Sequence, residues 1–169
     1  MSEQWKKGLL AAGWNLRKAV ELAIAIEEMG TELYRRLGRK WESNADLQDL
    51  FTRLAMEEVA HGEVLRTLLF IVGTPRTNPV DDLDEESLKA IAHASFFFEK
   101  GGALKGIEDL PTPEQVLDKV LKFEKSTLLY YRGLKDVLGA SPTLDGIIAE
   151  EKRHTVDVMR ALEGSSTRP

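Results

Sequence analysis

The same short motif, Glu-x-x-His, occurs twice in this 169-residue chain and uses two of its three histidines. One copy runs from Glu58 to His61 and the other from Glu151 to His154. Both copies stand in the middle of segments with a strong helical pattern. Residues three apart on a helix point in the same direction, so each copy places a carboxylate beside an imidazole. Such a pair is half of a metal site, and two pairs predict a complete one.

The chain is predicted to be all-α and to form one domain over residues 1–169, because its length suits one core and no strand pattern competes with the helical one. The first two expected helices run from about Asn15 to Leu37 and from a cap at Ser43 or Asn44 to about Val72. The third begins at a cap, Thr112, with Pro113 in the first helical position, and ends at Gly139. The fourth runs from Ser141-Pro142 to about Leu162. Short loops make these into two antiparallel hairpins, about 15–72 and 113–162. The connection between them, about 73–112, holds an expected extra helix from Asp84 to Glu99. A four-helix bundle with one long crossover is the arrangement of ferritin-like folds.

Heptad spacing marks the core-facing positions of each helix, which are apolar near the helix ends and polar in the middle. The polar members of this set are Glu27, Glu58, His61, Glu124, Glu151 and His154. Burying a lone carboxylate costs several kcal/mol, and four like charges add to that cost. Two divalent cations would balance the four carboxylates, and each imidazole would supply a nitrogen ligand. Oxygen-rich sites with some histidine suit iron or manganese, and zinc is a frequent substitute.

A simpler interpretation makes these residues surface glutamates and ordinary core histidines. It would suffice for one Glu-x-x-His, but six polar residues in register on four helices favour the metal site. Glu57 and Glu150 each precede a proposed ligand and are expected to face solvent, because adjacent helical residues point about 100° apart.

At these residues the chain resembles the ferritin-like di-iron carboxylate superfamily and, within it, the rubrerythrins. The matching segments are 26–34, 50–61, 123–131 and 150–154. The resemblance implies two iron ions bridged by Glu58 and Glu151, with Glu27 and His61 on one ion and Glu124 and His154 on the other. It also implies that Tyr34 and Tyr131, each seven residues after a proposed ligand, bond to a ligating carboxylate across the bundle. The alternative is that both are core tyrosines with other partners.

Two departures limit what the resemblance implies. Rubrerythrins carry a further glutamate one turn after the ligand of the third helix, where this chain has Thr127. The six-ligand set is closer to the symmetrical centre of bacterioferritin, so the peroxidase chemistry of rubrerythrin is in doubt. Rubrerythrins often carry a rubredoxin domain as well, and a chain without cysteine has none. We therefore expect a separate electron donor.

The expected function is that of a di-iron redox protein that reduces peroxide or dioxygen, or that oxidises Fe(II). One alternative is a bundle that binds and handles metal ions without catalytic turnover. The other is a structural bundle whose fold the metal ions only stabilise. Gly30 and Thr127, two small residues beside the site, would either leave room for a small oxidant or merely allow close packing.

The net charge of −5 speaks against a nucleic-acid partner. No segment offers the roughly 20 apolar residues of a membrane span, and none resembles a signal peptide, so a cytoplasmic protein is expected. Trp5 and Trp14 flank an amphipathic start that is expected to dock on a second subunit, which predicts a homodimer. His93, beside Phe96, Phe97 and Phe98, is expected to be structural.

Overall fold

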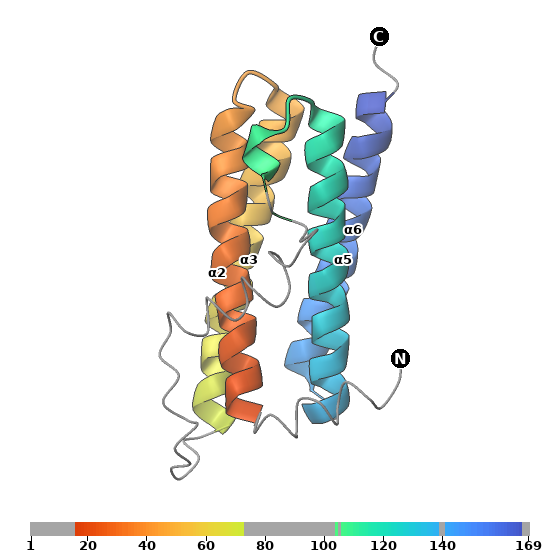
Figure 1. Ribbon diagram of the computed structural model, residues 1–169. Coiled ribbons are helices and arrows are strands. Elements are labelled where there is room, and N and C mark those ends of the chain that lie inside the picture. Colours follow the sequence, from red (N-terminus) through yellow and green to blue (C-terminus); the bar gives the residue numbers. More distant parts are fainter. Residues whose placement is uncertain (1–15, 73–103, 105, 139–140, 167–169) are drawn as a thin grey trace.

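Four long helices form the molecule, which we describe from a computed structural model (Figure 1). The structure describes residues 16–72, 104, 106–138 and 141–166. The helices are α2 (Leu16–Lys40), α3 (Ala45–Val72), α5 (Pro113–Leu138) and α6 (Pro142–Ser166), and a short 3₁₀ helix, η2 (Ile107–Asp109), precedes α5. Within these residues there is no strand, so the predicted all-α bundle of ferritin-like type is confirmed.

The predicted caps account for three of the four helix starts. Asn44 Oδ1 accepts the backbone N–H of Leu47 at 3.2 Å at the start of α3. Thr112 Oγ1 accepts that of Gln115 at 3.4 Å, and Ser141 Oγ that of Leu144 at 3.3 Å. Each of these side chains satisfies one of the amide groups that a helix start leaves without a partner.

Two helix ends lie beyond their predicted positions. The glycine rule placed the end of α2 near Gly38 and that of α6 before Gly164, but α2 continues to Lys40 and α6 to Ser166. A glycine ends a helix when it adopts a positive φ. Among the described residues only Gly106, just before η2, has one, at 64°. Both glycines therefore continue the helix.

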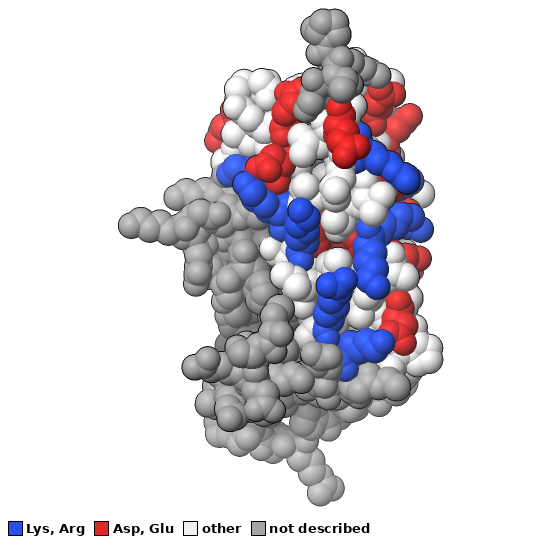
Figure 2. Space-filling view, turned by 90° about the vertical axis from the view of Figure 1, so that its right-hand side faces the viewer, with Lys and Arg blue, Asp and Glu red and all other residues white. Residues whose placement is uncertain are grey.

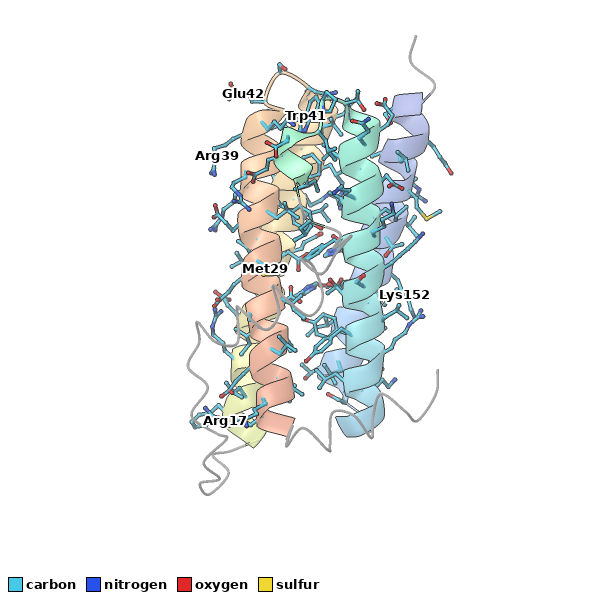
Figure 3. All side chains as sticks on the ribbon, viewed as in Figure 1. Arg17, Met29, Arg39, Trp41, Glu42 and Lys152 are labelled. Atoms are coloured by element: carbon cyan, nitrogen blue, oxygen red, sulfur yellow. The ribbon has the colours of Figure 1, made fainter. Side chains whose placement is uncertain are left out.

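The bundle packs as two hairpins. α2 packs mainly on α3 and α5 mainly on α6, and the hairpins meet where α3 contacts α6 and α2 contacts α5 (Figure 1). Side chains fill the space between the hairpins (Figure 3). No described helix has the length and apolar character that a membrane span requires.

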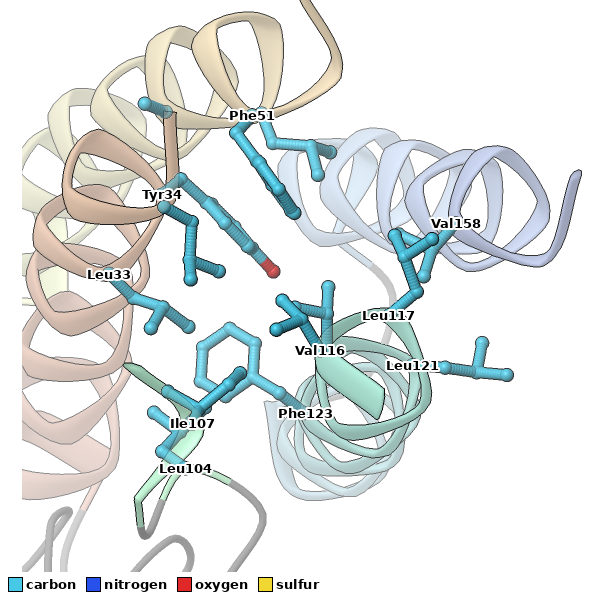
Figure 4. Packing of buried hydrophobic residues seen from close by; sticks show 14 of the residues in the cluster. Leu33, Tyr34, Phe51, Leu104, Ile107, Val116, Leu117, Leu121, Phe123 and Val158 are labelled. Atoms are coloured by element: carbon cyan, nitrogen blue, oxygen red, sulfur yellow. The ribbon is translucent and has the colours of Figure 1, made fainter. Parts of the chain in front are cut away.

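Two apolar clusters fill the core, and the polar core-facing residues lie between them. The larger cluster includes Phe51, Phe123 and Val158, with the ring of Tyr34 stacked on Phe51 at 6.2 Å between ring centroids (Figure 4). The smaller cluster includes Val20, Leu65 and Tyr131. The division of the core thus follows the predicted pattern of apolar ends and a polar middle.

η2 attaches the end of the crossover to the first hairpin. Ile107 is buried in the larger cluster, and Arg36 forms an ion pair with Glu108 at 2.7 Å. Lys40 Nζ donates to the carbonyl oxygen of Glu108 at 2.7 Å. The expected crossover helix (Asp84 to Glu99), His93, Phe96 to Phe98, Trp5 and Trp14 lie outside the described residues.

Candidate metal centre

The six polar core-facing side chains come together at mid-height of the bundle. Each is at most 2% exposed, so all of them are inside the protein: Glu27 on α2, Glu58 and His61 on α3, Glu124 on α5, and Glu151 and His154 on α6. The rings of the two histidines lie 5.5 Å apart, stacked across the interface of the hairpins.

Two groups of potential ligand atoms can be distinguished within this cluster. In the first, Nδ1 of His61 lies 3.4 Å from Glu27 Oε2, 3.5 Å from Glu58 Oε2 and 3.1 Å from Glu151 Oε1. In the second, Nδ1 of His154 lies 3.5 Å from Glu124 Oε2, 3.8 Å from Glu58 Oε1 and 3.7 Å from Glu151 Oε1. Each histidine therefore faces one carboxylate of its own, and Glu58 and Glu151 lie near both.

The donor atoms of the cluster fit a pair of cations. Glu27 Oε2, Glu124 Oε2 and both oxygens of Glu151 are buried without a hydrogen-bond partner, as are the Nδ1 atoms of the two histidines. Buried polar atoms nearly always have a partner, and orphaned carboxylate oxygens are the costliest exceptions. Oxygen and imidazole donors that converge in this way are suited to iron, manganese or zinc. The residues present thus fit two divalent ions.

Crowding of the carboxylates perturbs their ionisation. Burial, and next the negative charge of Glu27, raise the pKa of Glu58 well above its usual range. Burial raises the pKa of Glu151 to about 8. Burial alone would lower the pKa of His61, but its bonds to Glu151, Glu27 and Glu58 raise it overall. Without metal the cluster therefore holds protons, and cations that bind there must displace them.

Two tyrosines bond to ligand-position carboxylates across the bundle. The Tyr34 hydroxyl donates to Glu124 Oε1, and the Tyr131 hydroxyl donates to Glu27 Oε1. Both tyrosines are completely buried, and each joins one hairpin to the other. Each bond fixes one carboxylate oxygen and leaves the second oxygen directed to the histidine, as such outer contacts do in metal sites.

The expectation that Glu57 and Glu150 face solvent holds only in part: their side chains are 23% and 45% exposed, but each carboxylate also turns toward a histidine. Glu150 Oε2 lies 2.6 Å from Nε2 of His61, and Glu57 Oε2 lies 3.0 Å from Nε2 of His154, although these last two atoms are not aligned as a hydrogen bond. Both glutamates do leave the core-facing stripe, but their side chains are long enough to reach the facing helix of the other hairpin. The repeated Glu-Glu pair was the signal in the sequence, since the first Glu of each pair faces the outer nitrogen of the histidine of the other motif.

Gly30 makes room for Glu58. A Cβ atom at Gly30 would lie 3.3 Å from Cγ and Cδ of Glu58 and 3.4 Å from its Oε1, which is tighter than ordinary packing. The hydroxyl of Thr127 instead donates to the carbonyl oxygen of Phe123 at 3.2 Å within α5. The two small residues beside the site thus differ: one gives a ligand-position carboxylate its space, and the other satisfies its own helix.

The fold and the buried carboxylate–histidine cluster define a ferritin-like four-helix bundle with a candidate two-metal centre. The rubrerythrin family model matches residues 18–81, which include Glu27, Glu58 and His61. This match confirms the rubrerythrin-like character of the chain over its first helical hairpin. No curated protein and no solved structure gives a significant match.

Proposed function

We propose that this protein is a di-iron carboxylate oxidoreductase that uses peroxide or dioxygen as oxidant, in the manner of a peroxidase or a ferroxidase. The observation that carries the proposal is the presence of two groups of ligand atoms that share the buried carboxylate of Glu58, with Glu151 near both histidines. Glu27 and His61 would hold one ion, Glu124 and His154 the other, and Glu58 and Glu151 would bridge them. Two iron ions held in this way supply a pair of electrons and the Lewis acidity that stabilises developing oxide charge.

The protein's own groups orient and enclose that chemistry. Tyr34 and Tyr131 each tie up one oxygen of a terminal carboxylate, which keeps the other oxygen available. Glu57 and Glu150 face the outer nitrogens of the histidines, which favours the tautomer whose Nδ1 is free to bind metal. The apolar clusters on both sides exclude bulk water.

Thr127 supports a six-ligand centre rather than the rubrerythrin pattern with a further glutamate. It offers no carboxylate, and its hydroxyl bonds within α5. The ferroxidase reaction, in which Fe(II) is the substrate, is therefore the favoured form of the proposal. The reductant, when peroxide is consumed, is proposed to be a separate molecule because the chain has no cysteine for a rubredoxin-type site.

The test is oxidation of bound Fe(II). Protein that has been stripped of metal is loaded anaerobically with two Fe(II) per chain, and the absorbance of Fe(III) is followed after peroxide or dioxygen is mixed in. Fast oxidation that Glu124→Ala abolishes supports the proposal. Tight binding of two ions without fast oxidation would instead identify a metal-handling bundle, and failure to bind two ions would refute the metal centre itself.

A further inference from the structure

A pocket of about 280 Å³ opens on the outer side of the first hairpin and reaches the candidate metal centre. It lies between α2 and α3, and two of the proposed ligands, Glu27 and Glu58, line it. Both are at most 2% exposed, so they form its inner end. Each has a buried carboxylate oxygen without a hydrogen-bond partner, Oε2 of Glu27 and Oε1 of Glu58. The pocket therefore ends at the side chains of two proposed ligands.

The missing side chain of Gly62 leaves this pocket open. A Cβ atom there would lie 3.7 Å from Cβ of Glu27 on one side and 3.3 Å from Nη1 of Arg66 on the other. Gly62 is thus situated between the guanidinium of Arg66 and the buried stem of a proposed ligand. A larger side chain at this position would project into the space between them.

The outer end of the pocket carries two acidic groups and two arginines, Arg35 and Arg66. Glu28 and Glu32 line it, and Arg66 forms an ion pair with Glu28 at 2.5 Å from α3 to α2. The Arg66 side chain is half exposed, so it can swing into solvent at little cost. Carboxylates along such a path attract cations and raise their rate of association.

The second hairpin differs from the first at the same positions. Matching the ligands of the two halves aligns Gly62 with Thr155, Glu28 with Lys125 and Glu32 with Leu129. Lys125 is exposed, and Figure 2 shows Lys and Arg side chains gathered over the middle of the face where α5 and α6 lie. Lys152, the counterpart of Val59, extends from the outer side of α6 (Figure 3). A cation that approaches this face meets positive charge.

We propose that the pocket between α2 and α3 is the route by which divalent metal ions reach the centre, and that the Arg66–Glu28 ion pair covers it. This inference depends only on the part of the proposed function that places metal ions in the cluster. The six ligands are arranged in nearly symmetrical halves, but access to them is one-sided. Ions enter past Glu28 and Glu32 when Arg66 moves away, and the first ligands they meet are Glu27 and Glu58.

The test measures the rate of metal uptake rather than catalysis. Metal-free protein is mixed with Co(II) in a stopped-flow instrument, and the absorbance of bound Co(II) gives the association rate and the number of ions per chain. Gly62→Leu should slow uptake by about tenfold, equivalent to about 1.4 kcal/mol in barrier, without changing the number bound. Thr155→Leu, the matched change on the other hairpin, should leave the rate unaltered. Arg66→Ala should speed uptake several-fold.

The outcomes separate the route from the centre. Equal rates for Gly62→Leu and Thr155→Leu, with two ions still bound, would overturn the route and leave the proposed function intact. If wild-type protein bound no Co(II), the metal centre and the route would both be refuted. Arg66→Ala acts in the opposite direction from Gly62→Leu, so it decides the question even if leucine at position 62 impairs folding: unchanged or slower uptake by this variant contradicts the proposed gate.

Discussion

Removal of the carboxylate behind His154 should weaken one metal position more than the same change behind His61. Glu57 is 23% exposed and lies 3.0 Å from the outer nitrogen of His154, and Arg153 holds its other oxygen at 2.8 Å. Glu150 is 45% exposed beside His61. Water can replace a half-exposed carboxylate more readily than one that a neighbouring arginine holds in place.

Carboxylates that orient histidine ligands typically contribute about 10–100-fold to metal affinity, which corresponds to about 1.4–2.7 kcal/mol. We expect Glu57→Ala to fall in the upper part of this range and Glu150→Ala near its lower end. The difference arises because loss of Glu57 removes the carboxylate that lies 3.0 Å from the outer nitrogen of a completely buried imidazole, whereas solvent can reach the site that Glu150 vacates.

The assay is competition for Zn(II) or Co(II) against a chromophoric chelator, with both dissociation constants fitted. Arg153→Ala is the control, since it removes the exposed ion pair of Glu57 but keeps the carboxylate. Exposed pairs contribute about 0–1 kcal/mol, so this variant should bind metal almost as tightly as wild type. The reasoning is refuted if Glu57→Ala binds as tightly as Arg153→Ala, or if Glu150→Ala loses more affinity than Glu57→Ala.

Three further predictions concern the same centre. Gly30→Ala should displace the Glu58 carboxyl group by a few tenths of an ångström and change the spectrum of bound Co(II), because the added methyl would lie 3.3 Å from it; Gly146→Ala, with nothing within 4 Å, is the control and should leave the spectrum unchanged. Chelation should lower the melting temperature, since ligand at about 100 times its dissociation constant stabilises the fold by about 2.7 kcal/mol per site; equal melting curves with and without chelator would contradict metal binding. The pKa of Glu151 is raised from 4.5 to about 8, so the folded metal-free protein holds a proton that the unfolded chain has lost, and its stability should fall as the pH rises through this window. Metal-loaded protein should show the opposite trend below pH 8, because protons compete with the ions, and parallel pH profiles in thermal melts would show that the cluster does not bind them.

The sequence predicted the positions that depend on helical periodicity. The core-facing pattern gave the direction of Glu27, Glu124 and the two Glu-x-x-His motifs, because a stripe of apolar residues fixes which side of a helix is buried. The capping residues Thr112 and Ser141 were equally predictable, since their chemistry is local. The structure brings these groups together as the pattern requires.

The contacts between helices could not be read from periodicity. Glu57 was assigned to solvent because its backbone position points away from the core, but the reach of its side chain and the proximity of α6 decide where its carboxylate lies. The pocket beside Gly62 was missed for a related reason. The role of a glycine in a helix can be inferred only when the atoms that a side chain at that position would contact are known. Sequence periodicity determines which face of a helix is buried, but it does not determine how far that helix lies from its neighbour.

The outer contacts of the centre all run between the two hairpins. Tyr34 bonds to Glu124, Tyr131 bonds to Glu27, and the glutamates that precede Glu58 and Glu151 face histidines of the opposite hairpin. Within each hairpin the helices pack more extensively than the hairpins pack on each other. Without cations, these buried ionisable groups lie at that weaker interface, where their desolvation opposes association of the hairpins. Metal binding at the cluster would therefore be coupled in free energy to the docking of one hairpin on the other, because the same carboxylates take part in both.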